Sequence, residues 1–192
     1  CRAVIALFCI HLSGCTAITA ASAIPGVLYG VVADQFTGEE ESFPYTMRST
    51  LAATQKALQS MQLDIDVLEI QDDGGYGVAF NNDRLDGEIE LRKQTKRLTT
   101  IYIKVKATIR EESVERAIIQ LIDAKLRKAP RAARFQREKY NNLRAEPTIK
   151  STRVGWFRPG ATLDARKTGE PGWLKIKMPS GKTAFLKGSM VQ

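Results

Sequence analysis

Four short runs of alternating apolar and polar residues lie between residues 63 and 107, and they constrain the fold of this chain most strongly. In the first run, apolar residues alternate with Asp64 and Asp66, and the turn signal Asp72-Asp73-Gly74-Gly75 follows. The other three runs begin near residues 76, 88 and 101. Because each run is apolar on one face and polar on the other, the pattern predicts a four-stranded antiparallel meander with one covered face.

Two amphipathic segments flank these runs and are expected to cover the apolar face of the meander. Residues 45–61 and residues 111–128 both carry apolar side chains at helical spacing. The second segment begins with glutamates and ends with basic residues, an arrangement that suits the helix dipole. Residues 39–128 are therefore expected to form an α+β domain. Residues 42–46 could instead form a short strand before the first helix.

The chain opens with an apolar segment, residues 3–12, behind the single charge of Arg2. A short apolar core after a positive charge is typical of a secretory signal peptide. The sequence Leu12-Ser13-Gly14-Cys15 resembles the lipobox of bacterial lipoproteins. That resemblance implies cleavage before Cys15 and acylation of its sulfur by fatty acids such as palmitate. Residues 1–14 are then a lipoprotein signal peptide, and residues 15–38 an Ala/Gly-rich segment next to the membrane.

An uncleaved transmembrane helix is the alternative for this region. No residue between Arg2 and Asp34 is charged, so the stretch exceeds the ~20 apolar residues that span a bilayer. Pro25-Gly26 opposes that alternative, because this pair would break or kink a helix near its middle.

Cleavage at the lipobox would restrict the chemistry of the mature chain. His11 is the only histidine, and Cys15 would be the only cysteine left. Ser-His-Asp triads, Cys-His dyads and Cys/His zinc sites would then be excluded. We expect no catalytic residue, no metal site and no cofactor apart from the lipid on Cys15; an enzyme that uses only carboxylates and lysine is the weaker alternative. The acidic residues of 64–73 are expected to form a solvated face, not a cation site.

Positive charge is concentrated in the last third of the chain. Residues 127–192 carry a net charge of +12, whereas residues 1–126 carry −4, which together make the +8 of the whole chain. Residues 129–146 are expected to be a basic linker with a short helix over 131–143. Its arginines are candidates for contact with an anionic surface, and a solvated linker is the alternative. These candidates are Arg131, Arg134 and Arg137.

Residues 147–192 change to short strands separated by tight turns. The stretch Gly172-Trp173-Leu174-Lys175-Ile176 and the later Ser180-Gly181-Lys182-Thr183 turn resemble a bacterial SH3-like domain. The resemblance implies a small all-β barrel. A compact segment, residues 155–160, replaces the long first loop of that family. Four aromatic residues are candidates for a binding groove, with core packing as the alternative: Trp156, Phe157, Trp173 and Phe185.

The order helix, four strands, helix after a lipobox resembles a family of small proteobacterial lipoproteins that is catalogued as a domain of unknown function. The resemblance covers about residues 12–126 and implies no catalytic residue. Thr16 after Cys15 resembles outer-membrane cargo under the sorting rule of enteric lipoproteins. We therefore expect a non-enzymatic envelope lipoprotein that faces the periplasm and binds peptidoglycan or an envelope protein; nucleic acid is not expected. The alternative is a structural subunit or assembly factor of an envelope complex that docks protein only.

Overall fold

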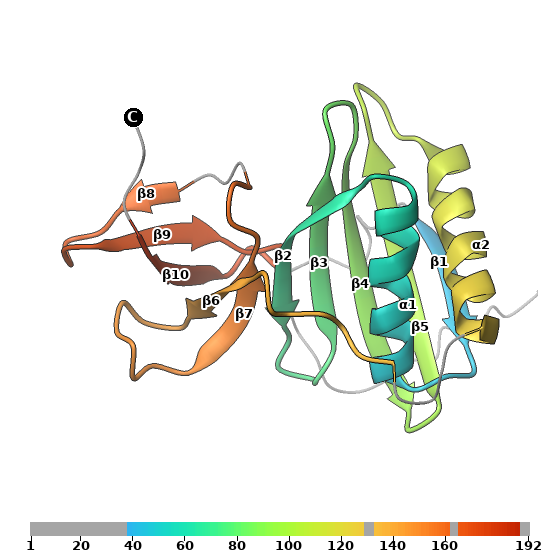
Figure 1. Ribbon diagram of the computed structural model, residues 1–192, viewed down its shortest axis with the longest axis horizontal. Helices are drawn as coiled ribbons and strands as arrows, with labels where there is room; N and C mark the ends of the chain where they lie inside the picture. The colour runs from blue at the N-terminus through green and yellow to red at the C-terminus, as the bar shows by residue number, and fades with distance from the viewer. Residues whose placement is uncertain (1–37, 129–132, 162–164, 189–192) are drawn as a thin grey trace, which may run out of the picture.

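The described residues form one open β-sheet with two helices on one of its faces. The computed structural model describes residues 38–128, 133–161 and 165–188. Its strands join in a ten-stranded sheet of order β1-β5-β4-β3-β2-β7-β6-β10-β9-β8 (Figure 1). Every neighbouring pair of strands in this sheet runs antiparallel. Among these residues, no helix is long and apolar enough to cross a membrane.

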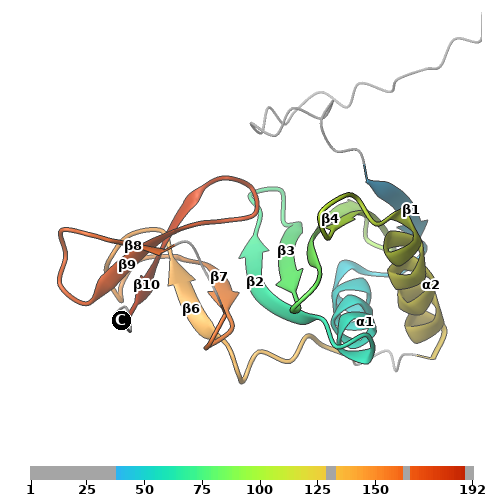
Figure 2. The same cartoon turned by 90° about the horizontal axis from the view of Figure 1, so that it is seen from above.

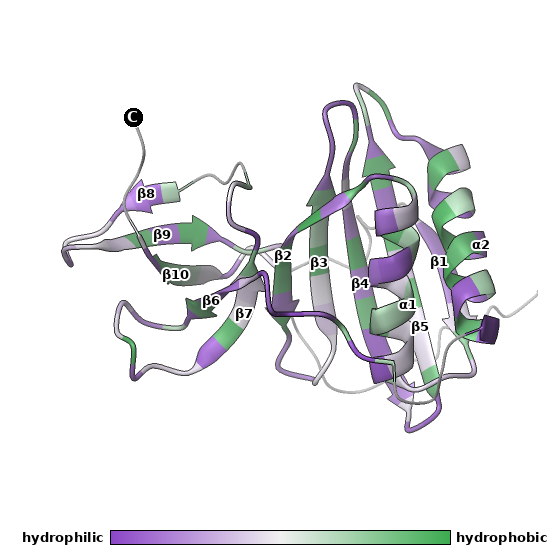
Figure 3. Ribbon diagram, in the orientation of Figure 1, coloured by the Kyte–Doolittle hydropathy of each residue, from purple (hydrophilic) through white to green (hydrophobic). Residues whose placement is uncertain are grey.

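The N-terminal half of the sheet contains the four strands that the alternating runs predicted. The expected four-stranded meander is nevertheless wrong as an architecture, because β1 adds to β5 and β7 adds to β2. Figure 3 shows hydrophobic and hydrophilic bands alternating along these strands. The strands of this half are β1 (Glu39–Phe43), β2 (Asp64–Ile70), β3 (Tyr76–Asn81), β4 (Asp86–Thr95) and β5 (Leu98–Lys106).

Both expected helices form, as α1 (Met47–Ser60) and α2 (Glu112–Lys128). They lie side by side on one face of the N-terminal half (Figures 1 and 2). The Thr46 hydroxyl caps α1 by accepting a hydrogen bond from the Ser49 backbone N–H at 3.2 Å. The apolar stripes of the helices and the facing side chains of the strands share one buried core. The periodicity of the sequence predicted this buried apolar face. Its burial is the main favourable contribution to the folding of this half.

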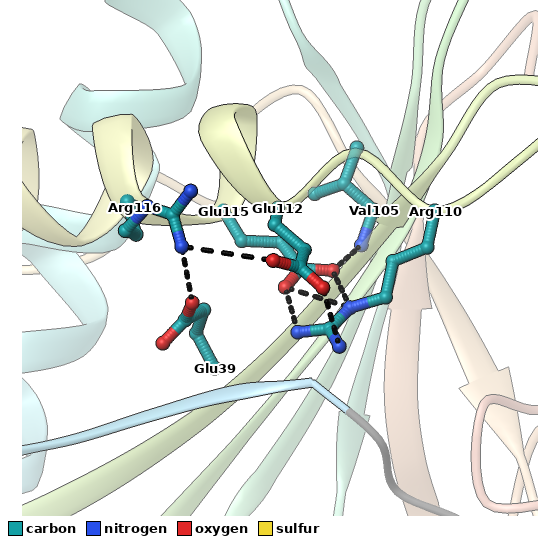
Figure 4. Close-up of polar contacts among 6 residues, drawn as sticks. All are labelled: Glu39, Val105, Arg110, Glu112, Glu115 and Arg116. Atoms are coloured by element: carbon teal, nitrogen blue, oxygen red, sulfur yellow. Dashed lines mark hydrogen bonds and ion pairs between the residues drawn. The ribbon is translucent and has the colours of Figure 1, made fainter.

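A buried carboxylate fastens the first turns of α2 to β5. Glu115 is fully buried and accepts hydrogen bonds from the Val105 backbone N–H at 2.9 Å and from Arg110 at 2.7 Å (Figure 4). Burial opposes the charged form of this carboxyl. Arg110 and the Val105 N–H outweigh that effect, and the pKa of Glu115 lies below its ordinary value. Nearby, Arg116 contacts Glu39 of β1 at 3.0 Å.

The C-terminal half of the sheet is not an SH3-like barrel. Its strands are β6 (Asn141–Arg144), β7 (Arg153–Phe157), β8 (Ala165–Lys167), β9 (Trp173–Lys177) and β10 (Thr183–Lys187). Strand β7 pairs with β2, and β8 pairs only with β9 among the described strands. The edge of β7 that a closed barrel would need is therefore occupied by β2, and the sheet stays open.

A β-bulge in β2 allows this strand to serve both halves. The alternating pattern placed Ile65 and Val67 on one face, but the register shifts between them. As a result Ile65 and Leu68 pack in the core under the helices, whereas Val67 packs in a second core with Leu143 of β6. A bulge adds one residue to a strand and so exchanges the faces of the residues that follow it.

The connector between α2 and β6 contains no helix in its described part. Residues 133–137 have no regular structure, and β6 begins at Asn141, so the helix expected over residues 131–143 is wrong for these residues. The side-chain amide of Gln55 in α1 accepts from the Gln136 N–H at 2.8 Å and donates to the Gln136 carbonyl at 3.1 Å. Phe135 is buried in the core beside them. These contacts hold the connector against α1, where a helix would use the same backbone groups internally.

Candidate ligand-binding cavity

A cavity of about 540 Å³ lies where the start of α1, the β2–β3 turn, the end of β4 and the connector meet. The start of α1 and the two strand turns lie at the same end of the strands of the N-terminal half, at the bottom of Figure 1. No aspartate or glutamate is among the residues that line this cavity, all of which are described. Its lining contains five basic and three aromatic residues: Arg48, Lys93, Lys96, Arg134 and Arg137, with Tyr76, Phe135 and Trp156.

Trp156 forms one wall and orients the arginines around it. It lies in β7 opposite Leu68 of β2, and only 5% of its surface is exposed. The guanidinium of Arg137 lies 5.2 Å from the centre of its ring, and that of Arg153 lies 4.9 Å from it. Cation–π contacts of this kind favour a fixed position of the guanidinium. Pairing of β7 with β2 therefore brings Arg137 to the cavity.

The connector forms a second wall. Its position depends on the two hydrogen bonds between Gln55 and Gln136, and on a longer one from the Arg48 Nε to the Ala133 carbonyl at 3.4 Å. Phe135 is buried and contacts Tyr140 with ring centres 5.4 Å apart. Arg134, on the exposed side of the same segment, lines the cavity.

The strand ends form the remaining wall. The turn between β2 and β3 is held by a hydrogen bond of 2.7 Å from the Gly75 N–H to the Asp73 carboxylate. A Cβ atom at Gly75 would lie 2.5 Å from the Leu91 carbonyl oxygen, so the close approach of this turn to β4 requires glycine. Lys93 and Lys96 extend from the end of β4 and the turn after it.

Most of the cations at the cavity have no acidic partner among the described residues. Lys93, Lys96, Arg134 and Arg137 form no ion pair within 4 Å with any residue of the described ranges. Arg92, next to Lys93 in the sequence, shows the contrast, because it pairs with Glu90 at 2.8 Å. Unpaired cations around a concave surface create a positive potential that attracts anions.

The structure brings together only part of the residues singled out from the sequence. Trp156, Arg134 and Arg137 line the same cavity, although 19 residues separate Arg137 from Trp156. The other three aromatic candidates do not line it: Phe157, Trp173 and Phe185 are half-buried in β7, β9 and β10. Arg131 and the expected lipobox, Leu12, Ser13, Gly14 and Cys15, lie outside the described residues.

Sequence reasoning did not find the rest of the lining. Lys93 and Lys96 lie between the starts of the third and fourth predicted strands, and Arg48 and Tyr76 lie in a predicted helix and a predicted strand, without a predicted role in binding. Their local sequence patterns do not indicate a binding site. Arg48 and Lys96 are far apart in the sequence, and basic residues are common at exposed positions. The concentration of basic residues after residue 127 was a usable signal for Arg134 and Arg137 alone.

The acidic residues of β2 were expected to form a solvated face, and this is wrong for two of them. Asp66 is buried and accepts a hydrogen bond from Arg158 at 2.7 Å, and Glu69 is buried against Ser180. Burial raises the pKa of Asp66, and the contact with Arg158 only partly opposes this effect. Within the described ranges, no cluster of three or more His, Cys, Asp or Glu residues could hold a metal ion.

Residues 1–124 match the model of DUF3568, a family described as protein of unknown function. The match spans more than half of the 192 residues, so this chain belongs to the DUF3568 family. The resemblance to a domain of unknown function is thereby confirmed. No curated protein matches the chain. The matched region contains Arg48, Lys93 and Lys96, whereas the connector and Trp156 lie beyond its end.

Proposed function

We propose that this protein is a non-enzymatic lipoprotein of the bacterial cell envelope. It is tethered to the outer membrane through acyl chains on Cys15, and its folded part is a binding module that faces the periplasm. The observation that carries this proposal is the sequence Leu12-Ser13-Gly14-Cys15 directly after an apolar segment. Burial of each acyl methylene contributes ~0.8 kcal/mol, and one chain alone binds a membrane only marginally. Two or more chains on Cys15 would make the tether stable.

The side chains of the mature protein favour binding over catalysis. After cleavage, proton transfer would depend on Asp, Glu, Lys or Tyr, because the only histidine precedes the cleavage site. The largest group of converging side chains in the described cavity consists of cations and aromatic rings. Such a lining attracts anions but offers no carboxylate as a general base. We therefore propose that the folded part binds an anionic component of the envelope, with peptidoglycan and an envelope protein as the partners that the sequence suggested.

The intact mass of the protein purified from membranes tests the tether. We expect residues 15–192 plus the mass of the acyl chains. Cys15→Ser should leave an unprocessed, unmodified chain. Cys9→Ser is the matched control, since it removes a cysteine from the same apolar region and should leave processing unchanged. A chain that keeps residues 1–14 and carries no acyl group would refute the proposal.

A structural subunit or assembly factor of an envelope complex is a second candidate. The observation that favours it is the open sheet, in which β1 and β8 each have one neighbouring strand among the described residues. Edge strands present unpaired backbone groups that another chain can join. Cross-linking in cells distinguishes the two functions, because this one requires a single dominant protein partner. An absence of any cross-linked protein would exclude it.

A further inference from the structure

We infer that the basic cavity is a binding site for a ligand that carries phosphate next to an apolar or ring-shaped group. The inference deepens the proposed function by naming the class of ligand, and it rests on that proposal only in treating the protein as a binding module. Acylation of Cys15 is not required for it. The cavity volume, about 540 Å³, lies in the range of small-molecule sites, roughly 300–1,000 Å³.

The charge of the cavity selects for a multivalent anion. Five basic side chains line it without any carboxylate, and four of them have no ion pair within the described ranges. A carboxylate brings one negative charge, whereas a phosphate monoester brings about 1.5 to 2 near neutral pH. A phosphorylated ligand therefore compensates this cluster with fewer groups than a carboxylate ligand of the same size.

The two kinds of cation lie on different segments, so an anion between them would be held from two sides. Lys93 and Lys96 come from the end of β4 and the following turn, and Arg134 and Arg137 come from the connector. Lysine acts as a point charge, while the planar guanidinium of arginine can bind two phosphate oxygens at once. The combination suits a phosphate group that both walls approach.

Apolar side chains make up most of the rest of the lining. Leu51, Leu68 and Phe135 are almost fully buried, and Tyr76 and Met47 are half-buried around them. Of these side chains, only Tyr76 and Met47 keep enough exposed surface for a ligand to contact. A bare inorganic anion would leave that surface uncovered, whereas a ring or an acyl group attached to the phosphate would cover it. Burial of apolar area contributes roughly 25 cal/mol per Å². We therefore assign the phosphate to the cations and the apolar part of the ligand to Tyr76 and Met47.

Trp156 acts as a positioning residue in this site. Its ring makes cation–π contacts with Arg137 and Arg153, and the contact with Arg137 places that guanidinium at the cavity. An arginine that is already oriented loses less conformational entropy when a ligand binds. The ring itself is too deeply buried, at 5% exposure, to be the main contact of the ligand.

Calorimetric titration of the full protein tests the inference with two phosphate sources. The probes are pyrophosphate in solution and vesicles of phosphatidylglycerol, with phosphatidylcholine vesicles as the zwitterionic reference. The cavity variant combines Lys93→Gln and Lys96→Gln. The matched control combines Arg166→Gln and Lys167→Gln, which remove the same charge from exposed positions of β8. All four side chains are exposed and form no ion pair within the described ranges, so both variants should fold.

We expect saturable binding of at least one probe, weakened roughly tenfold in the cavity variant and by less than about twofold in the control. Pyrophosphate binding without vesicle binding would indicate a soluble phosphorylated ligand. Vesicle binding that requires phosphatidylglycerol would indicate a lipid headgroup. Trp173→Phe leaves Trp156 as the only tryptophan, and its emission should change with the bound probe.

Three results would overturn the inference. They are no saturable binding of either probe, an equal loss in the two double variants, and binding of citrate as tight as that of pyrophosphate. If the first of these results occurs together with retention on peptidoglycan, the inference is refuted and the proposed binding function is left intact. An unmodified Cys15 would refute the lipid tether and would not affect this cavity.

Discussion

Glu69 in β2 and Ser180 in the turn between β9 and β10 are joined by two hydrogen bonds across 111 residues of sequence. The backbone N–H of Ser180 donates to the Glu69 carboxylate at 2.9 Å, and the Ser180 hydroxyl donates to its other oxygen at 2.5 Å. Glu69 is only 2% exposed. This contact, the pairing of β7 with β2 and the ion pair of Arg158 with Asp66 connect the two halves of the sheet.

Glu69→Ala should lower the free energy of unfolding by about 1–3 kcal/mol, because Ser180 would lose two partly buried hydrogen bonds to a charged acceptor. Chemical denaturation measures the change. Glu170→Ala is the matched control, since that residue is exposed in a turn and its side chain forms no ion pair within the described ranges. Equal effects of the two substitutions would show that the contact does not stabilise the junction.

Gly155→Ala should also weaken the junction of the two halves. A Cβ atom at this position would lie 2.4 Å from the Leu68 carbonyl oxygen, so β7 would have to move away from β2. Overpacking of this kind costs about 1–3 kcal/mol. The control is Gly169→Ala, where a Cβ atom meets nothing within 4 Å. A melting temperature that falls for neither variant would contradict the close approach of β7.

Arg158→Met should be strongly destabilising, because it leaves the buried carboxylate of Asp66 without its cation. Removal of one partner of a buried ion pair costs about 3–5 kcal/mol, and the partial exposure of Arg158, 28%, places the expected loss near the lower end. Addition of Asp66→Asn should restore part of the lost stability. A double variant no more stable than Arg158→Met would contradict the pairing, with denaturation midpoints as the measurement.

The same pair predicts a dependence of stability on pH. Burial raises the pKa of Asp66 above the ordinary 3.8, so the folded state holds this proton more tightly than the unfolded state. The contribution of Asp66 to stability is therefore fully present below pH 3.8 and is lost as the pH rises through the folded pKa. Asp66→Asn should abolish this component. Denaturation midpoints of the two proteins between pH 3 and about 7 provide the test.

Glu115 should show the opposite dependence on pH. Arg110 and the Val105 N–H keep its pKa below the ordinary 4.5 despite burial. Its contribution is present above pH 4.5 and is lost as the pH falls through the folded pKa. Glu115→Gln should therefore lower stability at neutral pH by about 1–3 kcal/mol and flatten the acid limb. Glu112→Gln is the control, because Glu112 contacts the same Arg110 but is 54% exposed.

Local periodicity was sufficient for most of the secondary structure of the N-terminal half. The helices and strands of residues 47–128 form close to where the apolar spacing places them, since each buries one face that its own sequence marks as apolar. The connector is the exception near this half. Its composition suits a helix, but Gln55 and the core under Phe135 provide better contacts for an extended segment.

The cavity could be predicted only in part, because tertiary packing brings its lining residues together. Concentrated basic charge singled out Arg134 and Arg137, and aromatic composition singled out Trp156. Lys93, Lys96 and Arg48 have no feature that separates them from ordinary surface residues. Their meeting with the connector depends on the packing of α1 and on the pairing of β7 with β2.

The sequence by itself determined the family of this protein, most of the helices and strands of its N-terminal half, and the lipobox-like segment Leu12-Ser13-Gly14-Cys15 on which the proposed tether rests. Tertiary structure decided that the sheet continues from β2 into β7 and does not close into a separate barrel. The physical reason is that β-strands satisfy their backbone hydrogen bonds with partners that can be distant in the chain. Leu68 and Trp156 are paired in this way across 88 residues, and no local pattern specifies that choice.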